Sequence, residues 1–197
     1  MKIIISPSKT QTLKKSSFLQ DRDILYPKKH KKILATLRKL NKTDLSKAYN
    51  VKGDLLESTY KSIKNYSKND TYHVFVSFDG LVFKNLETES YKAEEYIYLE
   101  KHLRILDAFY GVLEPGTLIK PYRLDMKTKI GFNLYHHWDI NSYFKNDIIV
   151  NLASDEFSKL LDVPLITISF LQNKNGVFIN QPTYSKQARG VFLDFKK

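Results

Sequence analysis

The sequence predicts an α+β fold in which a mixed β-sheet is flanked by helices. Short β-branched or apolar runs, such as those at residues 3–5 and 147–151, are separated by longer segments with helical periodicity. The chain has 197 residues, of which 42% are hydrophobic and 27% charged, as is usual for a globular domain. No internal repeat or low-complexity tract interrupts this pattern. We therefore expect residues 1–197 to form a single domain.

The first expected elements are a buried strand and a basic helix. Residues 3–5 form a β-branched run that ends at Ser6 and Pro7, which is typical of a strand leading into a functional loop. Residues 11–27 are polar and are expected to cross the surface. In residues 28–40, apolar side chains recur at helical spacing and lysines occupy the opposite face. This segment is therefore expected to be a basic amphipathic helix.

Residues 44–66 show two helical patterns that are interrupted at Gly53 and Asp54. Asp54 is placed to cap the second helix, with Glu57 as its capping-box partner. The outline is that of a helix-hairpin-helix-like element, although any pair of packed helices can look this way. In such a hairpin, helix amides and nearby lysines can hold a backbone phosphate. Within a basic helical region at about 28–68, the candidate phosphate-binding residues are Lys47, Lys52, Gly53, Lys61 and Lys64.

Strands and helices are expected to alternate in the rest of the chain. A second apolar segment at 81–83 follows the alternating run HVFVSF, and Ser154 is placed to cap a short helix. The Asn-Gly pair at 175–176 favours a hairpin turn. We expect strands at 73–78, 147–151, 164–171 and 177–180, and helices at 94–109 and from Tyr184 onward.

The positive charge of the chain is concentrated in its first third. Residues 1–70 hold 17 of the 32 Lys and Arg residues but only 6 of the 21 Asp and Glu residues, so this third accounts for the whole net charge of +11. Such asymmetry indicates a partner rich in phosphate, because Lys and Arg displace the counterions condensed on nucleic acid. A lysine-rich proteome would also give a basic chain, but would not by itself leave the remaining two thirds neutral.

Several classes of site are excluded by composition. The chain has no Cys, so disulfides, thiolate zinc sites, iron–sulfur clusters and a Cys nucleophile are absent. MKIIIS is too short an apolar run for a signal peptide, and no later run approaches the ~20 residues of a membrane span, so we expect a cytoplasmic protein. His136 and His137 are adjacent and point in different directions, and no third ligand stands at a usual spacing. We expect no metal and no cofactor, which argues against an iron-handling protein.

Polar residues at the ends of the expected strands form the candidate site, because loops that follow strands carry the binding sites of sheets. Tyr122 and Arg123 can stack on a base and contact a phosphate. Equally, Arg123 can form an ion pair with Asp125 or Glu156 that only fixes the loop. The candidate catalytic residues are Lys9, Asp125 and Glu156, and the candidate nucleic-acid or phosphate ligands of the cleft are Lys9, Tyr122, Arg123, Asn151, Ser154, Lys186 and Arg189.

The order of these groups along the chain resembles that of the YaaA family of bacterial peroxide-stress-resistance proteins. The matching stretches are ISPSKT at 5–10, FDGLVF at 78–83, HLRILDAFYGVLEP at 102–115, IKPYRLDM at 119–126, LYHHW at 134–138, VNLASDEF at 150–157 and KQARG at 186–190. They span nearly the whole chain, and their combination is specific where a single motif would not be.

The resemblance implies a YaaA-type fold and a cytoplasmic protein that limits oxidative DNA damage when peroxide meets intracellular iron. It also implies DNA binding through a helix-hairpin-helix, where Lys52, Gly53 and Asp54 fall, and through a positively charged cleft. This agrees with the basic first third of the chain. No settled enzymatic reaction comes with the family. An enzyme that acts on a nucleobase or nucleotide in the basic cleft is the alternative, with Glu156 or Asp125 as general acid or base and Lys9 as nucleophile or phosphate anchor.

The chain departs from the family pattern at several points. Leu81 replaces a residue that is often small or acidic, and Asp107 and Ala108 stand where Ser and Gly are common. Family members usually continue through a further helix and strand beyond the position of Lys197, so the resemblance is to a form with a shortened C-terminus. An exposed sheet edge there would favour association with another chain.

Overall fold

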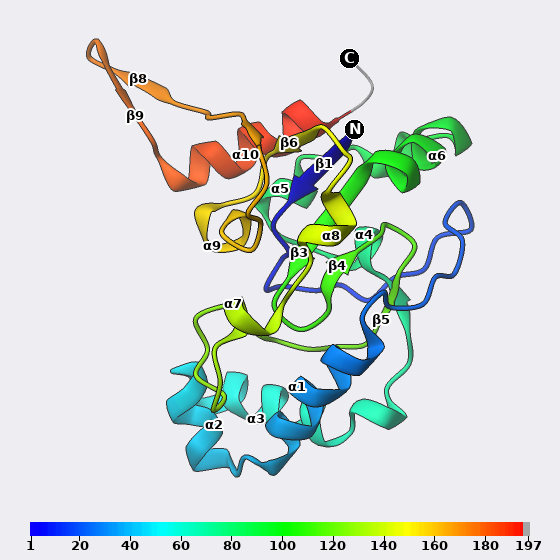
Figure 1. The fold of residues 1–197 in the computed structure, drawn as a ribbon, viewed down its shortest axis with the longest axis vertical. Coiled ribbons are helices and arrows are strands. Elements are labelled where there is room, and N and C mark those ends of the chain that lie inside the picture. Colours follow the sequence, from blue (N-terminus) through cyan, green and yellow to red (C-terminus); the bar gives the residue numbers. More distant parts are fainter. Residues whose placement is uncertain (195–197) are drawn as a thin grey trace.

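A mixed sheet of five strands forms the centre of the computed structural model, which describes residues 1–194 (Figure 1). Its strand order is β4-β3-β1-β6-β7. β4 is antiparallel to β3, and all other neighbours are parallel. The predicted α+β class is therefore confirmed. The strands are β1 (Lys2–Ile5), β3 (Leu103–Asp107), β4 (Gly111–Leu113), β6 (Ile149–Asn151) and β7 (Ile166–Thr167).

Smaller elements surround this sheet. Two further strand pairs are β2 (Tyr72–His73) with β5 (Leu118–Ile119) and β8 (Gln172–Lys174) with β9 (Val177–Ile179). The α-helices are α1 (Pro27–Lys39), α2 (Lys42–Tyr49), α3 (Gly53–Lys64), α4 (Val74–Ser77), α5 (Leu81–Lys84), α6 (Ala93–His102), α7 (Leu134–His137), α8 (Asn141–Phe144), α9 (Asp155–Ser158) and α10 (Pro182–Leu193). Short 3₁₀ helices lie at Tyr66–Lys68 and Thr88–Ser90.

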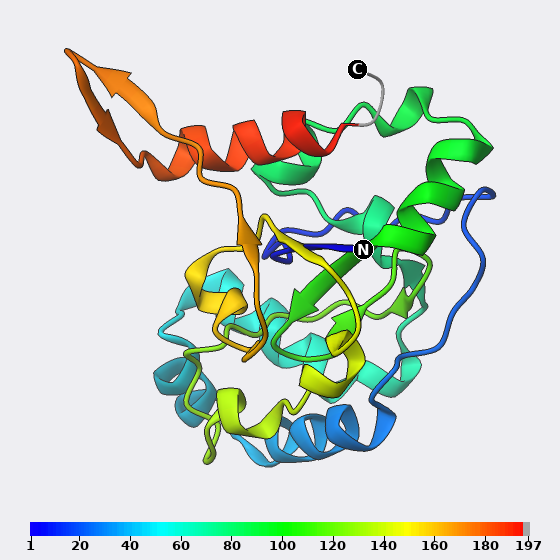
Figure 2. The same ribbon diagram turned by 45° about the horizontal axis from the view of Figure 1, so that its top comes forward.

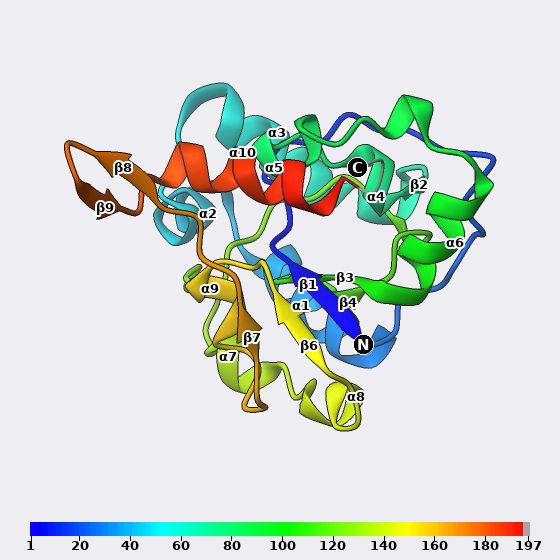
Figure 3. The same ribbon diagram turned by 90° about the horizontal axis from the view of Figure 1, so that it is seen from above.

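β1 lies in the middle of the sheet, between β3 and β6 (Figure 3). Ile3 stands opposite Leu103 on one side and Val150 on the other. β1 is nearly fully buried and β3 completely so, which explains their continuous apolar runs, because a parallel strand covered on both faces shows no polar alternation.

Helices α1 to α3 form a layer at one end of the molecule, whereas α10 and the β8–β9 hairpin lie at the other (Figure 1). The hairpin projects from the body at the start of α10 (Figure 2). The basic amphipathic helix predicted at 28–40 is confirmed as α1, which buries Ile33, Leu34 and Leu37 and leaves Lys28 and Lys31 exposed. The predicted strands at 3–5 and 147–151, the hairpin at 175–176 and the closing helix are also present.

Two of the predicted elements are wrong in type. Residues 74–77 form the helical turn α4 where a strand was expected, and residues 103–107 form β3 where helix 94–109 was expected to continue. In both segments nearly every side chain is buried. The sequence therefore lacks the alternation of polar and apolar residues that would distinguish a strand from a helix. Pairing with β1 and β4 decides the conformation of 103–107.

The strand predicted at 164–171 is much shorter than expected. Only Ile166 and Thr167 pair with β6, and both are exposed at the edge of the sheet. An apolar edge strand of this kind can pair with another chain, so association stays a prediction.

The helical pair predicted at 44–66 is present as α2 and α3, but its predicted capping box is wrong. Lys52 occupies the N-cap of α3 and makes no side-chain cap, and Asp54 lies inside the first turn. Glu57 instead forms an ion pair with Lys42 of α2, with 2.7 Å between Nζ and Oε1. Gly53 has a φ of 56°, a conformation that glycine adopts at little cost. Use of this pair as a DNA-binding helix-hairpin-helix is not confirmed by the fold and stays a prediction.

A buried ion pair connects β3 to the segment after β4. Arg104 is 4% exposed, and its Nη2 lies 2.9 Å from Oε1 of Glu114. The guanidinium also donates to the hydroxyl of Tyr143 and to the carbonyl of Glu100. A buried guanidinium requires such partners, because its desolvation is otherwise uncompensated.

Glu114→Ala should lower the free energy of unfolding by about 3 kcal/mol, because it leaves the Arg104 guanidinium buried beside an empty position. Urea denaturation followed by circular dichroism measures this, with Asp70→Ala, at an exposed carboxylate, as the control. A loss as small as that of the control would mean that water replaces the carboxylate.

Candidate functional site

Three parallel strands end at one edge of the sheet. The carboxyl ends of β3, β1 and β6 are Asp107, Ile5 and Asn151. From β1 the chain continues to β3 on one side of it and later to β6 on the other, so connections leave this edge in opposite directions. Such a switch in direction opens a crevice outside the strand ends, where sheets of this type bind ligands.

A cavity of about 350 Å³ lies at this edge, between the loop after β1, the start of α5, α9 and α10. Its volume falls within the range of small-molecule sites. The walls include the apolar side chains Leu81, Phe83, Leu152 and Phe157. The polar lining consists of Ser6, Ser8, Lys9, Thr10, Ser154, Glu156, Lys186 and Arg189. Of the residues predicted to contribute to one cleft, Lys9, Ser154, Glu156, Lys186 and Arg189 line this cavity, whereas Arg123 and Asn151 do not.

Ser6 and Ser154 connect two of the loops that line the cavity. The Ser6 hydroxyl oxygen accepts from the backbone amide of Ser154 at 2.9 Å and lies 3.1 Å from its hydroxyl. Ser154 is the N-cap residue of α9 but makes no side-chain cap, so its predicted capping role is wrong. Its hydroxyl instead contacts that of Ser6 at the cavity wall.

Asn151 does not line the cavity, although it was predicted as a ligand. It is buried at the end of β6, where its side-chain oxygen accepts from the amide of Ala153 at 2.9 Å. Its amide nitrogen donates to the hydroxyl of Thr167 at 3.1 Å. These bonds hold the end of β6 against β7, so Asn151 shapes the loop that carries Ser154.

The position of α10 brings two cations to the cavity. Lys186 is exposed, whereas Arg189 is half-buried and its Nε is buried with no hydrogen-bond partner within residues 1–194. Burial lowers the pKa of Arg189, and the nearby Asp155 opposes that shift. A Cβ at Gly190 would lie 2.3 Å from the carbonyl oxygen of Val82, so α10 can approach α5 this closely only with glycine there.

A smaller pocket of about 40 Å³ adjoins the cavity, because Pro7, Ser8, Lys9 and Phe157 line both. Nζ of Lys9 lies 2.8 Å from Oδ2 of Asp125. The Met126 amide donates to Glu156 at 3.2 Å, which holds this carboxylate against the same loop. Lys9, Asp125 and Glu156, the three candidate catalytic residues, are thus brought together from distant parts of the sequence.

Arg123 also lines the smaller pocket. Within residues 1–194 it forms no ion pair with Asp125 or Glu156, and Lys9 takes the place expected for it. The interpretation in which Arg123 serves only to fix the loop by such a pair is therefore wrong. Its guanidinium is available to a ligand.

Asp107 is a feature of the site that the sequence reasoning missed. It is fully buried at the end of β3 and lines the smaller pocket. Oδ1 accepts from the amides of Phe109 at 2.7 Å and Tyr110 at 2.9 Å, and Oδ2 accepts from the hydroxyl of Tyr122. Burial raises the pKa of Asp107 to about 6, although these three donors oppose the shift. The signal available in the sequence is a single carboxylate within the apolar run HLRILDAFYGVL, at a position where Ser is common in the family.

The Tyr122 ring is already engaged by the protein. It stacks on Phe109 with 5.3 Å between ring centroids and meets Tyr110 edge-on at 4.9 Å. Burial raises the pKa values of Tyr122 and Tyr110 well above the ordinary value and that of Tyr66 to about 12, so all three remain protonated at neutral pH. A base that stacked on Tyr122, as predicted, could use only the face of the ring that Phe109 does not cover.

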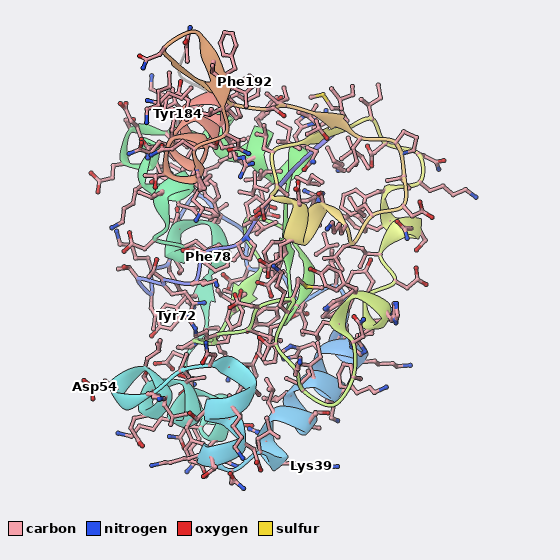
Figure 4. All side chains as sticks on the ribbon, turned by 90° about the vertical axis from the view of Figure 1, so that its left-hand side faces the viewer. Lys39, Asp54, Tyr72, Phe78, Tyr184 and Phe192 are labelled. Carbon is pink, nitrogen blue, oxygen red and sulfur yellow. The ribbon has the colours of Figure 1, made fainter. Side chains whose placement is uncertain are left out.

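Tyr122 and Arg123 also line a third, shallow hollow, together with Tyr66 and side chains of α1 and α3. This third hollow, of about 10 Å³, therefore adjoins the smaller pocket, which in turn adjoins the cavity. In Figure 4, Tyr184 and Phe192 of α10 lie at one end of the molecule and Asp54 of α3 at the other. Lys47, Lys52, Gly53, Lys61 and Lys64 are exposed on α2 and α3, outside the cavity itself.

Comparison with known proteins identifies the family. A family model described as peroxide stress protein YaaA matches residues 1–196. The chain belongs to this family. Among curated relatives, UPF0246 protein FN1762 of Fusobacterium nucleatum is 36% identical over 99% of this chain and 84% of its own length. UPF0246 protein MYPE6270 of Malacoplasma penetrans is 35% identical over 98% of this chain and 85% of its own, and a UPF0246 protein of Agathobacter rectalis is 30% identical over 99% and 84%.

Four of the motifs that resemble YaaA proteins contribute residues to the cleft, which consists of the cavity and the smaller pocket. ISPSKT, PYRLDM, VNLASDEF and KQARG supply Lys9, Arg123, Glu156 and Arg189, respectively. The LYHHW motif does not reach it: the Trp138 indole donates to the carbonyl of Ala108 and is buried. Within residues 1–194, no group of three His, Asp or Glu side chains is placed to hold a metal, and no helix is long and apolar enough to span a membrane.

Asp107→Asn should remove a pH dependence of stability. The folded pKa of about 6 exceeds the ordinary 3.8, so the native state binds more protons between these values and stability falls as pH rises through them. Relative to the variant, the wild-type free energy of unfolding should fall by about 2 kcal/mol between roughly pH 4 and pH 6. Asn can keep both backbone acceptor bonds, so it is a conservative reference.

Urea denaturation at a series of pH values gives this difference. A wild-type advantage that instead grows with pH would show that the three hydrogen-bond donors outweigh burial and that Asp107 is preferred as the carboxylate.

Proposed function

We propose that this YaaA-family protein binds DNA in the cytoplasm during the response to peroxide, and thereby limits iron-driven DNA damage. The observation that supports DNA binding is that neighbouring hollows share lining residues, from the cavity at α10 through the smaller pocket to the third hollow beside α1 and α3. Lys186 and Arg189 line the cavity and Arg123 and Tyr122 line the smaller pocket, so these three cations would meet phosphates there. DNA backbone would run from α2 and α3 into the cleft.

The helical pair has the properties of a nonspecific phosphate surface. The first amides of α3 receive no side-chain cap from Lys52, so they are open to an anion. The carboxylate of Asp54 in the first turn opposes an anion there. Attraction must therefore come mainly from Lys47, Lys52, Lys61 and other exposed lysines of these helices.

Changing four lysines of α2 and α3 to Gln should weaken duplex binding at least tenfold and flatten its salt dependence. Each phosphate contact that is lost lowers the slope of log affinity against log salt by ~0.9. Fluorescence anisotropy measures both effects with two labelled duplexes, one intact and one gapped. The substituted residues are Lys47, Lys52, Lys61 and Lys64.

A matched control removes the same charge elsewhere. It changes the exposed residues Lys101, Lys145, Lys159 and Lys174 to Gln. Equal losses in the two variants would mean that net charge alone attracts DNA. Absence of duplex binding by the wild type at low salt would end the DNA proposal.

A second candidate function is an enzyme that acts on a nucleobase or nucleotide. Asp107 favours it, because a buried carboxylate with a pKa near 6 can accept or donate a proton at neutral pH. The Tyr122 hydroxyl, which donates to Asp107, can relay that proton into the smaller pocket. Lys9 is held by Asp125, which suits a phosphate anchor better than a nucleophile, because a nucleophile must be the neutral amine.

If the cleft is catalytic, Asp107→Asn should slow turnover of its substrate at least 100-fold and leave duplex affinity within twofold. Asn cannot exchange a proton, and with its oxygen kept on the two backbone amides its NH2 group can donate to the Tyr122 hydroxyl in place of accepting from it. Nucleotides and oligonucleotides with normal and oxidised bases are incubated with protein in excess, and products are separated by mass spectrometry. A reaction that proceeds equally in the variant would remove Asp107 from the chemistry.

A further inference from the structure

We propose that the cavity between α5, α9 and α10 binds a phosphomonoester, with Arg189 and Lys186 holding the phosphate. The ligand is a nucleoside monophosphate or the phosphorylated end of a DNA strand, which present the same group. This inference rests on the proposed function, because it names the ligand class that the same cleft takes. It differs from backbone binding by α2 and α3, which involves phosphodiesters.

The state of Arg189 is the main argument. Its side chain lines the cavity, and its Nε is buried with no hydrogen-bond partner within residues 1–194. Leaving a charged donor dehydrated and unbonded is costly, and burial accordingly lowers the pKa of Arg189. A phosphate in the cavity would accept from the accessible nitrogens of this half-buried guanidinium, whose fork geometry can present two donors to one phosphate.

Charge around the cavity favours a dianion. Lys186 lies three residues before Arg189 on α10, so the two side chains share one face of the helix. Lys9, the third cation of the lining, is paired with Asp125. Glu156 also lines the cavity, and its carboxylate repels an anion, so the phosphate must lie at the wall formed by α10. Within residues 1–194 the two cations of that wall form no ion pair, and together they match a phosphomonoester, which carries about −1.5 to −2 at neutral pH, better than a phosphodiester with a single charge.

The opposite wall supplies further donors and an apolar surface. The hydroxyls of Ser6 and Ser154 meet at 3.1 Å, and at least one of their protons can turn toward a phosphate oxygen. Beyond them stand the apolar side chains Leu81, Phe83 and Phe157. Inorganic phosphate would leave this surface uncovered, whereas the sugar and base of a nucleotide would bury it, which explains a cavity of about 350 Å³.

The test compares ligands that differ only in the phosphate. Isothermal titration calorimetry is performed with adenosine, guanosine and thymidine, with their 5′-monophosphates and with inorganic phosphate. We expect each monophosphate that binds to do so at least tenfold more tightly than its nucleoside and than inorganic phosphate. Arg189→Gln and Lys186→Gln should each reduce that affinity at least fivefold, and Lys145→Gln, at an exposed site on another face, should not.

A second arm identifies the source of the phosphate. Single strands with a 5′-phosphate, a 3′-phosphate or hydroxyl ends are compared by anisotropy at high salt, where backbone binding is weak. Preference for a phosphorylated end that is lost in Arg189→Gln assigns the site to DNA ends. Monophosphate binding without such a preference assigns it to free nucleotides, and both outcomes support the phosphomonoester site.

The proposal is overturned if no monophosphate binds more tightly than its nucleoside. It is also overturned if both α10 variants bind like the wild type. Lys186 is exposed, so Lys186→Gln remains informative even where Arg189→Gln unfolds the chain, which thermal melts detect. Failure of duplex binding with retained monophosphate binding would reject DNA binding alone, and the converse result would reject only this site.

Discussion

The parallel pairing of β1 with both β3 and β6 is the constraint on which the site depends. The pairing places Ile3 between Leu103 and Val150, and the carboxyl ends of all three strands then meet at one edge. Residues from three distant parts of the chain come together there without any local sequence signal. A shift of register by one residue would turn every side chain of β1 to the opposite face and would move the loop after it relative to β3 and β6.

Burial gives the two charged side chains of β3 different properties. Arg104 has a carboxylate partner, Glu114, and its charge is compensated inside the protein. Asp107, three residues later, is bonded by two amides and a hydroxyl but by no cation within residues 1–194, because Lys9 pairs with Asp125. Neutral donors offset its desolvation only in part, which leaves a proton-exchanging group beside the pocket.

The helical pair α2–α3 and helix α10 each present cations that can meet phosphate, but in different ways. α2 and α3 expose lysines to solvent, where attraction to phosphate is long-range and weakened by salt. α10 instead places Arg189 at a partly enclosed wall, and its close approach to α5 depends on Gly190. The first arrangement suits a long polyanion in many registers, and the second suits one compact anion in a fixed orientation.

The sequence by itself determined the α+β class, the basic helix at α1, the hairpin at 175–176 and the family, because each depends on local periodicity, turn chemistry or motif order. It also named Lys9, Glu156 and Arg189 as cleft residues from their positions after strands or on the last helix. Tertiary structure decided that 103–107 is a strand, that Lys9 and not Arg123 pairs with Asp125, and that Asp107 is the perturbed carboxylate. Each of these depends on which groups meet across long separations and on how much water they lose, and no local pattern encodes either quantity.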